Sequence, residues 1–202
     1  MTAQMIISVL GGLGLFILGM EFMSEGLEKA AGDKLRRVLE LLTFNRFAAI
    51  LTGAGVTAVI QSSSATTVMV VGFVNAGLMD LTRAVGVILG ANIGTTVTGQ
   101  IVAFNISDIA LPAIAVGVVM FLFVKKRVYR SIGQGILGFG ILFLGISIMG
   151  RELATLQEYP GVLETLAMLG QYRLLGVLAG MLFTGIIQSS SAATAIVIVL
   201  TQ

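Results

Sequence analysis

Two short serine-rich blocks contain the residues whose types and spacing suggest chemistry. The first block is Gln61-Ser62-Ser63-Ser64, and Gln188-Ser189-Ser190-Ser191 repeats it 127 positions later. Each block interrupts a long apolar run, so its hydroxyls and freed backbone groups need partners that lipid does not supply. Two such interruptions in matching surroundings predict one binding site built from both blocks.

The composition excludes several classes of protein. The 202 residues are 56% hydrophobic and 11% charged, with a mean hydropathy of +1.02, which indicates a polytopic membrane protein. Cys and His are absent, which removes thiolate metal sites, disulfides and the usual near-neutral proton relay. Without a His or another base near the serines, nucleophilic catalysis has no support, so we expect no enzyme.

We expect an all-α integral membrane protein with inverted-topology repeats, each with a spanning helix, an interfacial connector and a re-entrant helical hairpin. The first repeat is residues 1–108, with spanning helix 5–23, amphipathic connector 24–46, re-entrant hairpin 47–75 and helix 84–104. Residues 109–130 form a bridging helix and a basic loop. The second repeat is residues 131–202, with spanning helix 132–149, connector 151–173 and hairpin 174–202, C-terminally incomplete.

Internal similarity supports the duplication. Gly12, Gly14 and Gly19 match Gly138, Gly140 and Gly145 at an offset of 126. Residues 51–61 match residues 178–188 at an offset of 127. Repeats with hydrophobic breaks at corresponding positions are typical of transporters.

The basic clusters predict the orientation. Residues 24–46 carry five Lys or Arg and residues 125–130 carry four, so the positive-inside rule places both clusters in the cytoplasm. A single crossing by residues 47–75 would put them on opposite sides, whereas a hairpin that enters and returns keeps both inside. The first helix then begins outside and its copy begins inside, which makes the duplication inverted.

A pair of helix starts facing each other from opposite leaflets would form an anion site. Unpaired N–H groups and the helix dipole favour negative charge there, and serine hydroxyls add donors. Lys and Arg are absent between Arg46 and Arg83 and after Arg173. The two helix starts contribute roughly half a positive charge each, which does not neutralise a divalent anion. Bound cations such as Na⁺ would supply the remaining positive charge.

Residues 90–98, Gly-Ala-Asn-Ile-Gly-Thr-Thr-Val-Thr, form a second motif. Gly86, Gly90 and Gly94 predict close packing against another helix. Either the Asn and Thr side chains of this motif supply oxygen ligands beside that contact, or the motif is only a seam of small residues between two helices. Glu21 lies in the first apolar run, and we place it at the membrane interface because its repeat counterpart is Ser147.

The doubled Gln-Ser-Ser-Ser block together with Gly-Ala-Asn-Ile-Gly-Thr-Thr resembles the type II sodium-dependent phosphate cotransporters (the Na⁺/phosphate symporter family), of the short bacterial kind. The resemblance implies sodium-coupled symport of inorganic phosphate across the cell membrane by alternating access, with no cofactor besides Na⁺ as coupling ion. It implies phosphate binding by Gln61, Ser62, Ser63, Ser64, Gln188, Ser189, Ser190 and Ser191. It implies sodium binding by Thr66, Thr67, Asn92, Thr95 and Thr194.

Several alternatives stay open. The Gly90-Ala91-Asn92 motif lies 29 residues beyond Gln61, so its counterpart would fall near position 217, beyond Gln202. One alternative is therefore that the chain is a non-transporting fragment or half-module of such a transporter, which needs further chain or a partner subunit. An anion channel is another reading, and a homodimer is compatible with the sequence.

Overall fold

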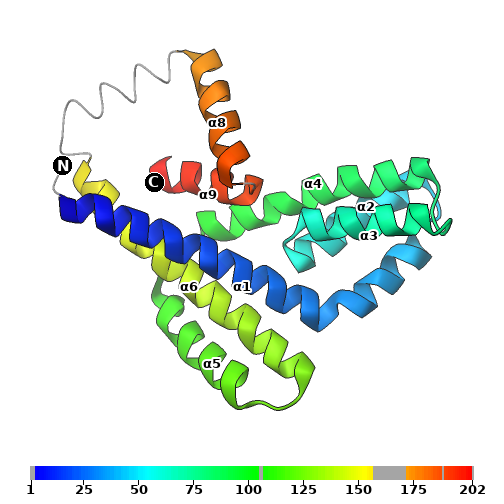
Figure 1. Ribbon diagram of the computed structural model, residues 1–202, viewed down its shortest axis with the longest axis horizontal. Helices are drawn as coiled ribbons and strands as arrows, with labels where there is room; N and C mark the ends of the chain where they lie inside the picture. Colours follow the sequence, from blue (N-terminus) through cyan, green and yellow to red (C-terminus); the bar gives the residue numbers. More distant parts are fainter. Residues whose placement is uncertain (1–2, 105–106, 157–171, 188, 202) are drawn as a thin grey trace.

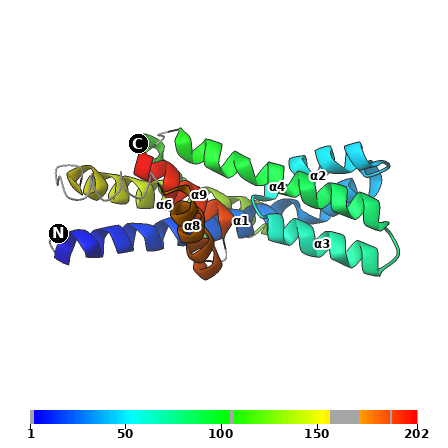
Figure 2. The ribbon, with the colours of Figure 1, turned by 90° about the horizontal axis from the view of Figure 1, so that it is seen from above.

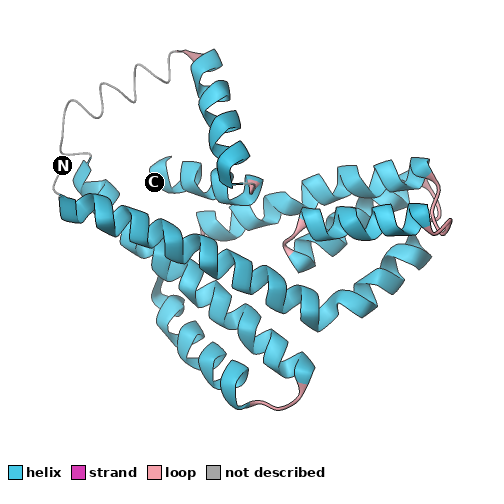
Figure 3. Ribbon diagram, in the orientation of Figure 1, coloured by secondary structure: helices cyan, strands magenta, loops and turns pink. Residues whose placement is uncertain are grey.

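The computed structural model describes residues 3–104, 107–156, 172–187 and 189–201. Its elements are α1 (Ala3–Leu42), α2 (Arg46–Ile60), α3 (Ser63–Asn75), α4 (Leu81–Ala103), the 3-10 turn η1 (Ser107–Ile109), α5 (Ala110–Phe123), α6 (Arg127–Leu156), α8 (Arg173–Ile187) and α9 (Ser190–Thr201). The described part of the chain contains helices and no strand (Figure 3). The all-α prediction is confirmed for these residues.

Helices α1 and α6 form an antiparallel pair that runs through the molecule (Figures 1 and 2). Glycine lets their backbones touch: a Cβ on Gly19 would lie 2.3 Å from the Leu142 nitrogen, and one on Gly138 would lie 2.2 Å from the Met23 nitrogen. Further along, Gly12 faces the Gly145 carbonyl in the same way. Helix α5 folds back along α6, where Gly117 meets Leu137.

Helices α2, α3 and α4 form the other half of the molecule (Figure 1). Helix α4 runs parallel to α2, and a Cβ on Gly90 would lie 2.0 Å from the Ile50 oxygen, while one on Gly94 would lie 2.4 Å from the Ala54 oxygen. The predicted close packing at Gly86, Gly90 and Gly94 is confirmed. Small residues at four-residue spacing lie on one helix face, which allows this approach.

Two apolar clusters hold these halves. One joins α1, α6, the end of α4 and α9, and includes Phe16, Leu142, Phe143, Val102 and Ala192. The other joins the second half of α1 to α2, α3 and α4, and includes Leu39, Val56, Ile60, Val70 and Val87. Because α1 and α4 contribute to both clusters, they connect the two serine blocks.

The helix boundaries differ from the predicted ones at several places. Residues 24–42 continue α1, where the sequence predicts a separate connector. No Pro interrupts this stretch, and the Lys29–Glu25 and Arg36–Glu40 pairs support it at i,i+4 spacing. Helix α6 begins at Arg127 rather than near 132. Most of the predicted connector 151–173 lies outside the described residues.

Three of the described helices are long and apolar enough to cross a membrane: Gln4–Leu42, Leu81–Ala103 and Arg127–Glu152. Helices α2 and α3 have 15 and 13 residues, too few to span singly at about 1.5 Å per residue. Large apolar side chains such as Leu51, Val68 and Leu111 are exposed. A lipid surround suits that distribution.

Candidate functional site

The first serine tip is the turn between α2 and α3, and Gln61 shapes it. Gln61 has φ 61° and ψ 20°, a left-handed conformation that is uncommon outside glycine. Its backbone N–H donates to the Thr57 carbonyl at 2.7 Å, which ends α2. This conformation directs the chain into α3, so the serines that follow lie at the turn.

The side chain of Gln61 ties this turn to its neighbours. Its Oε1 accepts a hydrogen bond from Thr98 Oγ1 of α4 at 2.6 Å, and its Nε2 donates to the Ala58 carbonyl at 2.5 Å. Its own carbonyl accepts from Ser24 Oγ of α1 at 3.3 Å. Gln61 and Thr98 are 7% and 2% exposed. Gln61 therefore positions the tip through both of its amide groups.

The serines that follow each turn cap the next helix in the same way at both tips. Ser62 Oγ accepts from the Ala65 backbone N–H at 3.2 Å, and Ser189 Oγ accepts from the Ala192 backbone N–H at 3.2 Å. Both residues are thus N-caps, which serine favours. Gln188 lies outside the described residues.

The two tips meet in one pocket of about 350 Å³, here called the serine pocket. Its lining contains both serine blocks and one face of α1, namely Gln61, Ser62, Ser63, Ser64, Ser189, Ser190, Ser191, Met20, Glu21, Ser24, Glu25 and Glu28. Every residue predicted to bind phosphate, apart from Gln188, lines this pocket. The starts of α3 and α9 point their first N–H groups toward the serine turns, as helix starts do.

Three carboxylates from α1 share this pocket with the serines. Glu21, Glu25 and Glu28 line it, and no Lys or Arg belongs to its described lining. Glu25 is bonded to Lys29 Nζ at 2.5 Å and to Gln134 Nε2 at 2.5 Å. No group of three or more carboxylates among the described residues converges on a metal position. The pocket therefore combines hydroxyl donors with negative charge.

The sequence did not lead us to these carboxylates. We expected Glu21 at the membrane interface, and the structure places it, exposed, in the lining of the serine pocket. The available signal was their spacing, because residues at i, i+4 and i+7 lie on one helix face. We also missed Thr98 as a positioning residue, although it belongs to the small-residue motif of α4.

A second pocket, of about 470 Å³, adjoins the serine pocket. Ser190 and Ser191 line both pockets, and this one also contains Asn92, Thr95 and Thr194. Three of the five predicted sodium ligands therefore lie together between α4 and α9.

The other two predicted sodium ligands, Thr66 and Thr67, lie elsewhere. Thr66 is fully buried, and its hydroxyl bonds to Thr57 Oγ1 at 2.9 Å and to the Ser62 carbonyl at 3.2 Å. Thr67 is partly buried on α3 and lines neither pocket. The Thr57–Thr66 bond closes the α2–α3 hairpin just behind the serine tip.

Comparison with known proteins gives consistent results. Residues 15–151 match the Na⁺/Pi-cotransporter family. Over 196 residues the chain is 31% identical to YjbB of Salmonella typhimurium, which is named for inorganic phosphate export. The aligned region covers 97% of this chain and 36% of YjbB. It is 32% identical over 176 residues to the uncharacterized protein YqeW of Bacillus subtilis (87% of this chain, 57% of YqeW).

A more distant relative is the sodium-dependent phosphate transport protein 2A of Rattus norvegicus. The two are 35% identical over 97 residues, which is 47% of this chain and 15% of the rat protein. The chain spans about a third of the length of YjbB, at 36%. No solved structure matches the chain.

Proposed function

The chain belongs to the Na⁺/Pi-cotransporter family, and from that premise and the lining of the serine pocket we propose that it moves inorganic phosphate across the cell membrane together with Na⁺. The anion binds in the serine pocket, between the starts of α3 and α9. The observation that carries the proposal is that two serine blocks far apart in the sequence line one pocket.

The pocket offers what a tetrahedral oxyanion requires. Serine hydroxyls and the free N–H groups of two helix starts are hydrogen-bond donors, and the helix dipoles add partial positive charge. The hydroxyls of Ser62 and Ser189 already cap their helices. The hydroxyls of Ser63, Ser64, Ser190 and Ser191 are then the donors that bind phosphate.

The charge of the pocket argues for accompanying cations. Glu21 and Glu28 line it with no Lys or Arg among the described lining residues, and adding a phosphate anion would place like charges together. Two helix starts contribute roughly half a charge each, which does not offset them. Na⁺ ions bound with the phosphate would, and the neighbouring pocket lined by Asn92, Thr95 and Thr194 has suitable oxygen ligands.

The inverted duplication is supported by the α1–α6 contact. Gly12 faces Gly145 and Gly19 faces Gly138, while by sequence Gly12 corresponds to Gly138 and Gly19 to Gly145. Such reciprocal contacts are what a two-fold axis between two copies of one helix produces. We propose that the two repeats rock about the α1–α6 pair, so that the serine pocket opens to each side of the membrane in turn.

The hairpins α2–α3 and α8–α9 are then re-entrant. Their helices have between 12 and 15 residues, short of the roughly 30 Å hydrocarbon core at about 1.5 Å per residue. The basic residues of the α5–α6 loop mark the cytoplasmic side, which places the N-terminus outside.

The direction of net transport follows the gradients. A relative is named for phosphate export, so both directions need measuring. The test is labelled-phosphate flux into and out of proteoliposomes, with and without a Na⁺ gradient. A gradient-driven flux supports symport, whereas equal flux without Na⁺ would indicate a channel. No flux from this chain, with flux from a longer relative, would indicate a half-module.

Variants test the site. Ser63→Ala and Ser190→Ala each remove one hydrogen bond to a charged ligand, which is worth about 1.5–3 kcal/mol, or about 10- to 150-fold in affinity. Ser147→Ala on α6, outside the lining of the serine pocket, is the matched control. If both pocket variants bind phosphate as the control does, the site is assigned wrongly.

A further inference from the structure

A third pocket, of about 440 Å³, lies between α1, α5 and α6 and has the opposite charge to the serine pocket. Its lining consists of Phe22, Glu25, Lys29, Phe121, Arg127, Arg130, Ser131 and Gln134, and we call it the basic pocket. On α1 it uses residues 22, 25 and 29, a face adjacent to the one that lines the serine pocket. Glu25 borders both pockets.

The cations of the basic pocket exceed its anions. Lys29, Arg127 and Arg130 face a single carboxylate, Glu25. Lys29 forms the ion pair with Glu25, which neutralises both. None of the ion pairs among the described residues includes Arg127 or Arg130. Two guanidinium groups therefore remain for a ligand.

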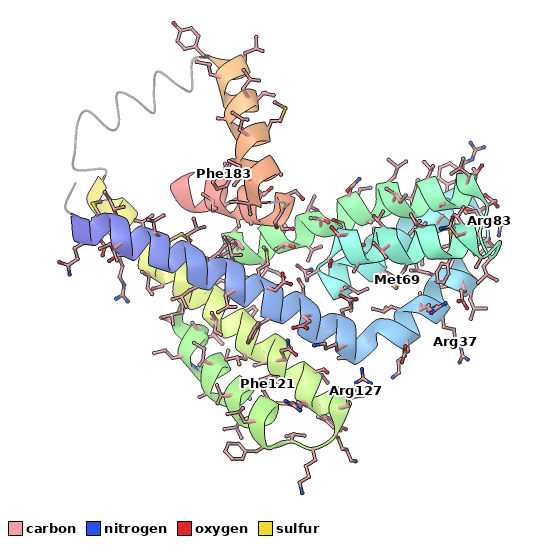
Figure 4. All side chains as sticks on the ribbon, viewed as in Figure 1. Arg37, Met69, Arg83, Phe121, Arg127 and Phe183 are labelled. Atoms are coloured by element: carbon pink, nitrogen blue, oxygen red, sulfur yellow. The ribbon has the colours of Figure 1, made fainter. Side chains whose placement is uncertain are left out.

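The guanidinium group of Arg130 is held in place. Arg130 lies over the ring of Phe121, with 5.1 Å from Cζ to the ring centroid, a cation–π contact. Figure 4 shows Phe121 on α5 and Arg127 at the start of α6, at the end of this helix pair that carries their connecting loop. A planar guanidinium that is already positioned loses less entropy when it binds an oxyanion.

Two polar side chains in the wall of the pocket are buried. Ser131 and Gln134 are 5% and 6% exposed, and both line the pocket. Gln134 donates to Glu25 Oε2, which keeps that carboxylate against α1 and α6. The start of α6 adds the positive end of a helix dipole beside the arginines.

From this arrangement we propose that the basic pocket binds a phosphate group, separately from the serine pocket. Arg127 and Arg130 bind its oxygens in the forked geometry that guanidinium groups form with phosphate, and the α6 start adds positive charge. The group belongs either to an anionic lipid headgroup or to free inorganic phosphate. Because Glu25 is shared, an anion that draws Lys29 away changes the charge of the serine pocket.

The test compares two double variants of equal charge. Arg127→Gln/Arg130→Gln removes the two arginines of the pocket and leaves the Lys29–Glu25 pair. Lys125→Gln/Lys126→Gln removes two cations of the adjacent loop that are not in the pocket lining. General attraction of a basic segment to an anionic surface, about 1 kcal/mol per charge, falls equally in both. A specific site is lost in the first variant alone.

The purified 202-residue chain is titrated in detergent without Na⁺, and its thermal midpoint is followed. One arm uses phosphatidic acid, with phosphatidylcholine as the lipid control. The other uses inorganic phosphate on the Ser63→Ala/Ser190→Ala background, which weakens the serine pocket. Stabilisation in the first arm identifies a lipid headgroup, and stabilisation in the second identifies free phosphate.

We expect the loop variant to keep the midpoint shift and the arginine variant to need at least about 10-fold more ligand. Arg127→Lys/Arg130→Lys retains the charge and so protects folding, and it loses part of the affinity because lysine cannot bind bidentately. Equal losses in the arginine and loop variants would overturn the proposal. So would the absence of any shift in both arms when Arg127 and Arg130 are intact.

Discussion

The hydrogen bond between Thr98 and Gln61 gives the most informative prediction, because it tests whether α4 positions the first serine tip. Thr98→Val replaces the hydroxyl with a methyl group of similar shape. Gln61 Oε1, which now accepts from Thr98 Oγ1 at 2.6 Å, then loses that donor in a buried position.

The magnitude follows from burial. A buried acceptor left unpaired costs about 1–3 kcal/mol. Among the described contacts, the tip has no other side-chain hydrogen bond to α4. We therefore expect the loss to destabilise the observed conformation of the serine turn by about 2 kcal/mol. If that cost depopulates the binding-competent turn, the apparent affinity for phosphate falls by as much as about 30-fold.

The assay measures phosphate binding and the thermal midpoint in the same detergent. Thr82→Val is the matched control, since Thr82 is exposed on the same helix and lines neither the serine pocket nor the pocket between α4 and α9. We expect it to change stability by less than about 0.5 kcal/mol. Thr98→Ser keeps the donor and should restore binding. A Thr98→Val protein that binds phosphate as well as Thr82→Val would refute this account of the tip.

Two further predictions concern stability. Ser62→Ala should lower the free energy of unfolding by about 1 kcal/mol, because it removes the N-cap of α3. Ser64→Ala, outside the cap, should change the thermal midpoint by no more than about a degree or two while still weakening phosphate binding. Equal midpoints for the two variants would argue against the cap. Gly138→Ala should lower the midpoint sharply, because its methyl group would lie 2.2 Å from the Met23 backbone nitrogen, and overpacking costs about 1–3 kcal/mol. Gly14→Ala meets nothing within 4 Å and should be neutral or stabilising, so similar effects of the two substitutions would contradict the close α1–α6 packing.

Much of the local structure was predictable because it depends on neighbouring residues. Runs of apolar residues define helices, and Asn45, Ser62 and Asp80 cap the helices that follow them. The packing of Gly90 and Gly94 against α2 follows from their spacing on one helix face. Residues 24–42 continue α1 because a change from apolar to charged composition need not end a helix when i,i+4 pairs continue it.

The candidate site was predictable in part. The doubled serine block pointed to one pocket, and its spacing at matching positions was sufficient for that. The partners of Gln61 were not predicted: its side-chain amide bonds to Thr98 and Ala58 inside the protein. The sequence does not show whether the Gln61 side chain will bond to a ligand or to Thr98, which lies 37 residues further along the chain on another helix.

The sequence alone indicated a membrane protein built from helices, with two matching serine blocks, since hydrophobic length, capping residues and internal repetition are local or periodic properties. The tertiary structure decided which surfaces meet. It brought Glu21, Glu25 and Glu28 to the serines and Arg127 and Arg130 to the adjacent face of α1. Those juxtapositions depend on the rotation of each helix about its axis, and backbone contacts at Gly19, Gly138 and Gly90 set that rotation.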